Sequence, residues 1–197
     1  MVDRIAIETG DDLLVLAYAR TRIEYRDPAS GRDLVLHPEP RGRAGRWPFP
    51  GRAAAAVVTA WHPRSERGRP PEHDRADLEE LRRLVLAGRL DPIDCVGHGD
   101  PADATPGGRT TRAFPPDHAA PTARAEGSGV ADGHADDAWS EPSLLVPGIA
   151  LADARELAAR FEQNAIFWWT PTEWRVVGVL LGMEDVVLGW SLSDRAA

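Results

Sequence analysis

Three residues of this chain, His62, Ser65 and Glu141, have side chains that can do acid–base or nucleophilic chemistry. His62 and Glu141 can act as an acid/base pair if a pocket shifts their pKa values, and they then activate the hydroxyl of Ser65 or Ser143. In the alternative interpretation each side chain is structural: Ser65 caps a turn, Glu141 pairs with an arginine and Ser143 hydrogen-bonds a sheet edge. These are the candidate catalytic residues, and the sequence leaves open whether the protein is an enzyme.

Arginines that precede a predicted helix indicate a second kind of chemistry. Arg64, Arg67 and Arg69 lie just before the helix, where guanidinium groups and free backbone N–H groups can together bind a phosphate or a carboxylate. The alternative is an exposed loop in which these arginines pair with nearby acids, namely Glu66, Glu72 and Asp74. The hypothesis that follows is a small anionic ligand held by Arg64.

Tryptophans and amides complete the predicted ligand-binding set. The Gln163 amide can read the hydrogen-bond pattern of a ligand, or it can satisfy loop carbonyl groups instead. Asn164 lies where a helix must stop and is adequately explained as a helix-ending residue in left-handed geometry. The predicted ligand-binding residues are Trp61, Arg64, Trp139, Ser143, Gln163 and Asn164.

Neither a metal site nor a cofactor is predicted. His98, His118 and His134 have aspartates around them, but no pair falls in a spacing that fixes ligand geometry. Cys95 is interpreted as a small core residue rather than a nucleophile. The sequence also lacks the common motifs of nucleotide-binding and dinucleotide-binding proteins, α/β-hydrolases and zincins.

The composition limits which binding partners and which cellular compartment we expect. The net charge of −8 disfavours nucleic acid, which normally requires a clustered excess of basic residues. The single cysteine excludes an internal disulfide and favours a reducing compartment. The N-terminus lacks the pattern of a signal peptide, and no run approaches the ~20 apolar residues of a membrane span. We therefore expect a soluble, cytoplasmic protein that binds neither membranes nor nucleic acid.

The elements that must position these residues begin with a β-hairpin. Segments 21–26 and 33–37 flank the turn-rich stretch 27–31, after a short helical turn over 13–19. The stretch 38–52 has no apolar periodicity, so a surface loop is predicted there.

A strand–helix–strand unit and an unusual insertion follow. The apolar run 53–61 predicts a strand buried on both faces, 74–87 a helix and 91–96 a short strand. Residues 97–138 are almost wholly Gly, Pro, Ala, Asp, Thr, Arg and His, and such a composition cannot offset the entropy of ordering itself. We expect a flexible insertion there that acts as a lid.

The C-terminal part repeats the unit and adds a meander. A strand at 144–146, a helix over 151–161 and a strand at 165–169 are expected. Two further strands, at 174–181 and 186–192, complete the sheet.

This order of elements is that of a ferredoxin-like unit with a split β-α-β core. We therefore predict an α/β (α+β) fold in a single domain over 1–197, with the hairpin and the meander extending the sheet. If the crossovers are right-handed, the ends of several elements meet at one edge. The polar candidates lie at those ends, so four segments share one predicted pocket.

Three motifs carry a resemblance to a known family. Thr59-Ala-Trp-His-Pro63 with Ser65, Trp139-Ser-Glu-Pro-Ser143 and Phe161-Glu-Gln-Asn-Ala-Ile166 keep the order found in domain of unknown function 3293, a bacterial family. The resemblance covers roughly residues 16–166. That family usually has Asn at the position of His62 and a much shorter connection in place of the insertion. The resemblance implies a domain and no activity.

Two functions are compatible with these observations. The first is a small domain that binds, and can act on, an anionic small molecule at the converging end, under the insertion. The second is an interaction or regulatory protein that uses the dense aromatic residues of its C-terminal sheet to bind a protein or a second copy of itself as a homodimer. The residues concerned are Phe167, Trp168, Trp169, Trp174 and Trp190.

Overall fold

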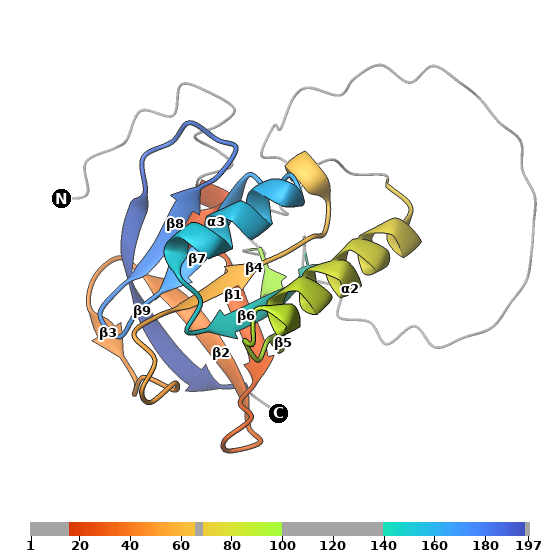
Figure 1. Cartoon of the computed structure of the whole chain (residues 1–197). Coiled ribbons are helices and arrows are strands. Elements are labelled where there is room, and N and C mark those ends of the chain that lie inside the picture. Colours follow the sequence, from red (N-terminus) through yellow and green to blue (C-terminus); the bar gives the residue numbers. More distant parts are fainter. Residues whose placement is uncertain (1–15, 66–68, 100–139, 196–197) are drawn as a thin grey trace, which may run out of the picture.

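The described part of the computed structural model comprises residues 16–65, 69–99 and 140–195 (Figure 1). Its strands form one sheet in the order β2-β1-β5-β6-β4-β7-β8-β9-β3, and β2 pairs with β9 as well. That last pairing closes eight strands into an antiparallel barrel, while β3 joins β9 in parallel. The strands are β1 (Arg22–Arg26), β2 (Asp33–Glu39), β3 (Arg43–Ala44), β4 (Ala55–Val58), β5 (Ile93–His98), β6 (Ser140–Pro147), β7 (Ala165–Trp169), β8 (Trp174–Gly178) and β9 (Val186–Asp194).

The ferredoxin-like prediction is therefore wrong. The predicted hairpin and meander do form, but they do not simply extend an open sheet. The hairpin strand β2 pairs with the last strand β9 from Leu34 opposite Asp194 to Glu39 opposite Gly189. Because both edges of the sheet are used in this pairing, the fold is a closed barrel with helices on its outside.

The hairpin turn forms where the sequence predicted it, because side-chain contacts within the turn stabilise it. The Asp27 carboxylate accepts hydrogen bonds from the backbone N–H of Ala29 at 3.2 Å and of Ser30 at 3.1 Å. Gly31 follows with φ of +69°, a conformation that glycine adopts without a steric penalty. The turn thus fixes the register of β1 against β2.

Side chains alternate between two hydrophobic cores because successive residues of a strand face opposite sides of the sheet. Along β4, Ala55 and Val57 face the barrel interior, whereas Ala56 and Val58 pack under the helices. All four are buried, which confirms the prediction of a strand buried on both faces. The interior is filled mainly by large aromatic rings from the C-terminal strands.

Helices α2 (Pro71–Ala87) and α3 (Leu151–Arg160) lie on the same side of the barrel (Figure 1). Leu81 and Val85 of α2, with Ala154 and Ala158 of α3, bury their side chains against the outer face of the sheet. Residues 16–20 are also helical, and Tyr18 packs edge-on against Phe167, with ring centroids 6.0 Å apart. None of the described helices is long and apolar enough to cross a membrane.

The stretch 38–52 differs from the predicted surface loop. Strand β2 continues to Glu39, β3 pairs with β9, and the side chain of Phe49 is buried. Trp47 packs edge-on against Trp169 with centroids 4.9 Å apart. The prediction failed because isolated aromatic residues give no periodicity, although they can still close the end of a barrel.

The first residues of the predicted insertion also differ from the prediction, because they are part of a strand. Gly97 and His98 are the last residues of β5 and pair with Glu141 and Ser140 of β6. Residues 100–138 of the predicted insertion lie outside the described residues, so the prediction of a flexible lid stays a prediction.

Candidate functional site

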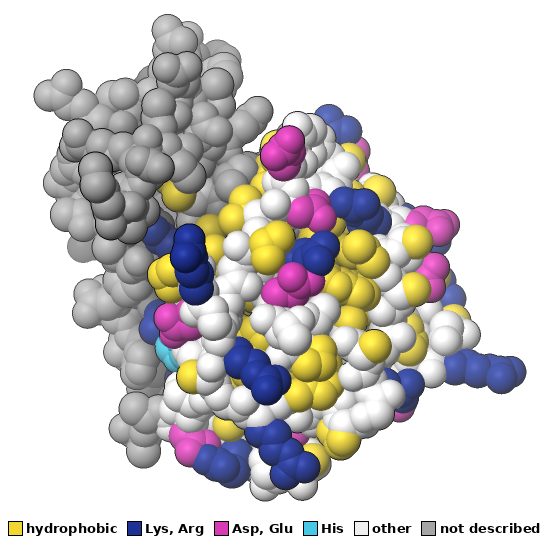
Figure 2. Space-filling model, turned by 90° about the vertical axis from the view of Figure 1, so that its left-hand side faces the viewer, with side chains coloured by type: hydrophobic (Ala, Val, Ile, Leu, Met, Phe, Trp, Pro, Cys, Tyr) yellow, Lys and Arg dark blue, Asp and Glu magenta, His cyan; other side chains and the backbone are white. Residues whose placement is uncertain are grey.

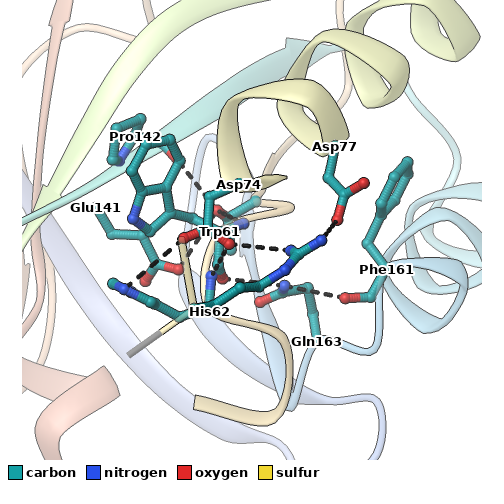
Figure 3. Close-up of polar contacts among 10 residues, drawn as sticks. Trp61, His62, Asp74, Asp77, Glu141, Pro142, Phe161 and Gln163 are labelled. Atoms are coloured by element: carbon teal, nitrogen blue, oxygen red, sulfur yellow. Dashed lines mark hydrogen bonds and ion pairs between the residues drawn. The ribbon is translucent and has the colours of Figure 1, made fainter. Parts of the chain in front are cut away.

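Four segments meet near one end of the barrel, and hydrogen bonds link them (Figure 3). The Thr59 hydroxyl, just after β4, donates to the carbonyl of Pro142 on β6 at 2.9 Å and contacts the Glu141 carboxylate at 3.4 Å. The Gln163 amide, after α3, donates to the carbonyl of Trp61 at 3.2 Å. Asp74, in the first turn of α2, is the fourth segment's contribution to this cluster. The structure thus brings together the ends that the sequence placed at one edge.

Glu141 is the buried acid of this cluster. Glu141, Ser143 and Leu145 alternate along β6, so they share the strand face that looks into the barrel. Burial raises the pKa of the Glu141 carboxyl to about 8; the hydrogen bond from Thr59 opposes this, and the nearby Asp74 carboxylate adds to it. A carboxyl group with this pKa is mostly protonated at neutral pH, and it can therefore donate a hydrogen bond.

Asp74 is almost completely buried, with 1% of its surface exposed. The Arg69 guanidinium donates to the Asp74 carboxylate at 3.0 Å and to that of Asp77 at 2.6 Å. This two-carboxylate contact raises the pKa of Arg69, mainly through the hydrogen bond to Asp77. The arginine therefore stays charged and compensates a carboxylate that would otherwise be costly to bury.

His62 approaches Asp74. Its backbone N–H donates to the Asp74 carboxylate at 3.4 Å, and its ring Nε2 lies 4.0 Å from the other carboxylate oxygen. The Trp61 ring stands nearly perpendicular to the His62 ring, with centroids 6.1 Å apart. The sequence had paired His62 with Glu141, whereas the acid that the structure places against it is Asp74.

Arg64, the predicted anion-binding residue, has a carboxylate partner just after the C-terminus of α3. Its guanidinium lies 2.6 Å from the Glu162 carboxylate, and its backbone N–H donates to the Glu162 carbonyl at 2.8 Å. Both side chains are more than half exposed, so the ion pair contributes little stability. Arg69 is paired as well, and Arg67 lies outside the described residues.

The backbone around this contact is strained. His62, Arg64 and Glu162 have φ of 46°, 55° and 53°, in the left-handed region that residues other than glycine rarely adopt. Such strain persists only where the surrounding structure enforces it, and it is concentrated at functional sites.

The side-chain amide of Gln163 and the backbone of Asn164 both have structural contacts in the described structure. Gln163 donates to the carbonyls of Trp61 at 3.2 Å and Phe161 at 3.1 Å, which is the carbonyl-satisfying alternative. The residue in left-handed geometry after α3 is Glu162, so the explanation of Asn164 as a left-handed helix-ending residue is wrong, whereas its predicted role in ligand binding stays a prediction. The backbone carbonyl of Asn164 accepts a hydrogen bond from the backbone N–H of Val179 at 2.9 Å, just after β8.

The remaining candidates are less closely connected to the cluster. Ser143 is buried on β6, and its hydroxyl donates to the Glu141 carbonyl at 3.3 Å. The backbone of Ser65 ends the short 3-10 turn η1 (Pro63–Ser65), but its side chain is outside the described part. Trp139 also lies outside the described residues. Trp61 is half-buried beside the cluster.

Sequence reasoning missed Thr59, Asp77 and the central position of Asp74. Asp74 was considered only as a surface partner for an arginine. The sequence did contain a signal for this contact. Asp74 lies in the first turn of a helix that directly follows an arginine-rich loop, so its carboxylate and a loop arginine can meet. Its burial depended on how α2 packs, which no local pattern contains.

A hollow of about 300 Å³ lies elsewhere, against β1, β5 and β6 beside α2. Its lining includes Glu24, Arg26, Asp94 and Ser143, but not Glu141 or Asp74. Of the predicted ligand-binding residues that the structure describes, only Ser143 contributes to it. Within the described part of the chain no group of three histidines, cysteines or acids is arranged to hold a metal ion.

Three of the four tryptophans of the C-terminal strands are interior residues. Trp169, Trp174 and Trp190 are fully buried inside the barrel, and Trp168 is half-buried against the helix-facing core. The large apolar side chains exposed among the described residues are instead Leu86, Leu180 and Val187. Figure 2, viewed from the side of β9 and β3, shows charged and apolar side chains interspersed. The interaction hypothesis therefore loses the tryptophan surface on which it rested.

The model of a family described as Protein of unknown function (DUF3293) matches residues 120–166. The resemblance to DUF3293 is confirmed. The match includes β6, α3 and the first residues of β7, and thus both Glu141 and Gln163. No curated protein and no solved structure matches the chain.

Proposed function

We propose that the protein binds a small ligand at the end of the barrel where Glu141 lies, and that Glu141 in its neutral form donates a hydrogen bond to that ligand. The observation that carries the proposal is the carboxyl of Glu141, which is buried where four segments meet and has a pKa of about 8. Carboxyl groups kept neutral at physiological pH are typical of sites that donate a proton to a bound molecule. A sufficiently basic ligand would take that proton.

The surrounding charges favour a ligand without negative charge. Arg64 is paired with Glu162, and Arg69 bridges Asp74 and Asp77. The described cluster therefore holds more carboxylates than guanidinium groups, and both guanidinium groups are already engaged. The prediction of an anionic ligand gains no support from these arginines.

The strained loop supports a functional role for the same end. The left-handed residues His62 and Arg64 lie between Thr59 and Arg69, both of which contact the buried acids. Residues other than glycine held in this conformation cluster at functional sites, and here two of them lie beside the buried acids. Cytoplasmic location stays part of the proposal, because the one cysteine, Cys95, is a buried free thiol.

Ligand-induced thermal stabilisation tests the proposal. The purified protein is screened at pH 6.5 and pH 9.5 against uncharged amides, lactams and sugars, with amines and sugar phosphates in parallel. A ligand at ~100 times its dissociation constant stabilises the folded state by ~2.7 kcal/mol. We expect uncharged acceptor-bearing compounds to stabilise the protein at pH 6.5 and to lose most of that effect at pH 9.5.

Three variants define the role of Glu141. Glu141→Leu should abolish the ligand effect, whereas Glu141→Gln, which keeps a donor, should retain it and remove its pH dependence. Glu156→Gln on the exposed face of α3 is the matched control. An unchanged response in Glu141→Leu, or no response to any compound in the panel, would refute the proposal.

A further inference from the structure

The connection between β2 and β4 carries positive charge that no acid compensates. Arg41, Arg43, Arg46 and Arg52 are all exposed, and the sequence has no acidic residue from 40 to 65. None of the four forms an ion pair with an acid among the described residues, whereas ten of the other fourteen described arginines do. Because guanidinium groups always stay charged, residues 41–52, the arginine segment, form a local excess of positive charge.

The fold holds the arginine segment in a defined conformation. Strand β3 pairs in parallel with β9, where the carbonyl of Gly42 accepts the backbone N–H of Trp190 at 3.0 Å. Phe49 is buried in the barrel, and the Trp47 indole donates to the carbonyl of Arg52 at 2.9 Å. A surface that is fixed before binding loses less conformational entropy when a partner docks on it.

The net charge of −8 does not describe this surface. The described residues include 18 arginines and 19 acids, so only −1 of that charge lies on them. The net charge led us to expect no binding of nucleic acid, but contact with a phosphate chain depends on basic residues clustered on one surface. Figure 2 faces β3 and β9, and arginine side chains in dark blue stand out from its lower half.

The side chains of the arginine segment indicate which anion it fits. A guanidinium group can pair with two phosphate oxygens at once, and its plane can stack on a nucleic-acid base. Trp47 lies among the arginines and is only half-buried, so part of its ring is open for stacking. The large apolar side chains exposed among the described residues belong to α2, β9 and the β8–β9 connection. The arginine segment therefore lacks such an anchor for insertion into a membrane.

We propose that the arginine segment is a docking surface for single-stranded nucleic acid, whose phosphates contact the arginines and one of whose bases stacks on Trp47. This surface goes beyond the site proposed at Glu141, because it is made of different residues. Variants of Glu141 should leave it intact, so the two proposals can fail separately.

Fluorescence anisotropy tests the proposal with the full-length protein and labelled oligo(U) or oligo(dT) of equal length. We expect dissociation constants of about 1–100 µM at ~50 mM salt, as for binding without sequence preference. Contacts from four arginines to phosphates predict that the affinity falls about 50-fold between ~50 and ~200 mM salt. Tighter binding of oligo(U) would identify RNA as the partner through its 2′-hydroxyl groups, and equal binding would mean that phosphates and bases alone are recognised.

Two double variants locate the contact. Arg41→Gln with Arg46→Gln removes two exposed guanidinium groups, so the affinity should fall only about 7-fold over the same range of salt. Arg75→Gln with Arg89→Gln removes the same charge from exposed positions outside the arginine segment and should leave the salt dependence of wild type. Circular dichroism checks that both variants are folded.

NMR of ¹⁵N-labelled indole groups tests the stacking on Trp47. We expect the Trp47 resonance to shift when oligo(U) or oligo(dT) is added. The resonance of Trp174, which is fully buried in the barrel, should stay in place and is the internal reference.

Three outcomes would overturn the inference. The first is an oligonucleotide affinity that is the same in wild type and in the Arg41→Gln, Arg46→Gln variant, or no binding at all. The second is binding of polyglutamate as tight as that of the oligonucleotides, which would indicate an acidic protein as the partner. The third is a Trp47 resonance that does not respond at saturating oligonucleotide.

Discussion

The hydroxyl of Thr59 joins two strands of the barrel, since it donates to the Pro142 carbonyl at 2.9 Å and contacts the carboxylate of Glu141 at 3.4 Å. Thr59 also accepts the backbone N–H of Trp61 at 3.0 Å. This one side chain therefore fixes the start of the strained loop and holds the buried acid. Its environment leads to the first prediction.

Stability should fall as the pH rises through the range set by Glu141. The pKa of this carboxyl is 4.5 when unperturbed and about 8 in the folded protein. Between these values the folded state binds more protons than the unfolded state, so the free energy of unfolding decreases with pH. The contribution is fully present below pH 4.5 and is lost as the pH rises to about 8. The slope is at most ~1.4 kcal/mol per pH unit.

Urea unfolding of wild type and Glu141→Gln from pH 5 to pH 8.5 measures this contribution. The two proteins should be similar in stability at pH 5, and the variant should be more stable by up to about 3 kcal/mol at pH 8. Parallel pH profiles for the two proteins would mean that Glu141 titrates normally.

Asp74→Asn should lower the pKa of Glu141, because the Asp74 carboxylate disfavours ionisation of its neighbour. The same variant should also destabilise the fold by about 1–3 kcal/mol, since Arg69 loses one of its two carboxylate partners. Carboxyl ¹³C NMR gives the pKa, and chemical denaturation gives the stability.

Two variants serve as controls for this effect. Thr59→Val should move the pKa of Glu141 upward, since it removes the hydrogen bond that favours the charged form. Asp77→Asn removes the other partner of Arg69 and should affect the Glu141 pKa less than Asp74→Asn does. If all three variants leave the titration in place, the Glu141 carboxyl does not sense these groups.

Gln163→Ala should destabilise the protein rather than only impair binding. It leaves the part-buried carbonyl of Trp61 and the buried carbonyl of Phe161 without their amide donor, at a cost of about 1–3 kcal/mol. Arg64→Ala removes an exposed ion pair with Glu162 and should cost less than about 1 kcal/mol. Thermal or urea unfolding compares the two, and equal stabilities would contradict a structural role for the glutamine.

Gly189→Ala should strongly disrupt the packing of β9 against the 41–45 segment. A Cβ at Gly189 would meet the carbonyl oxygen and the backbone nitrogen of Gly42, atoms that cannot move aside as a flexible side chain does. We expect a loss of about 3 kcal/mol or more, or failure to fold. Gly182→Ala is the control, because nothing lies within 4 Å of its added Cβ. Circular dichroism and urea unfolding give the result, and two equally stable variants would contradict the observed close approach.

Much of the candidate site was accessible to sequence reasoning. The sequence predicted Glu141, His62, Gln163 and Trp61 at one converging end, because local patterns locate the ends of strands and helices and right-handed crossovers bring those ends to one edge. Their contacts were not accessible: His62 meets Asp74, Gln163 bonds two carbonyls, and Arg64 pairs with Glu162. Side-chain pairing depends on a few ångströms of packing between elements that are far apart in the chain.

The sequence by itself determined most of the individual elements, although not β3. The turn at Asp27, the continuous apolar run of β7 and the helical spacing in α2 and α3 are set by neighbouring residues, and the structure has each where it was expected. Only the tertiary structure decided that the sheet closes, with Leu34 opposite Asp194. An open sheet and a barrel share the same alternation along each strand, so no local pattern separates them. Closure turned Trp169, Trp174 and Trp190 into an interior core, and the packing of α2 made Asp74 a buried acid.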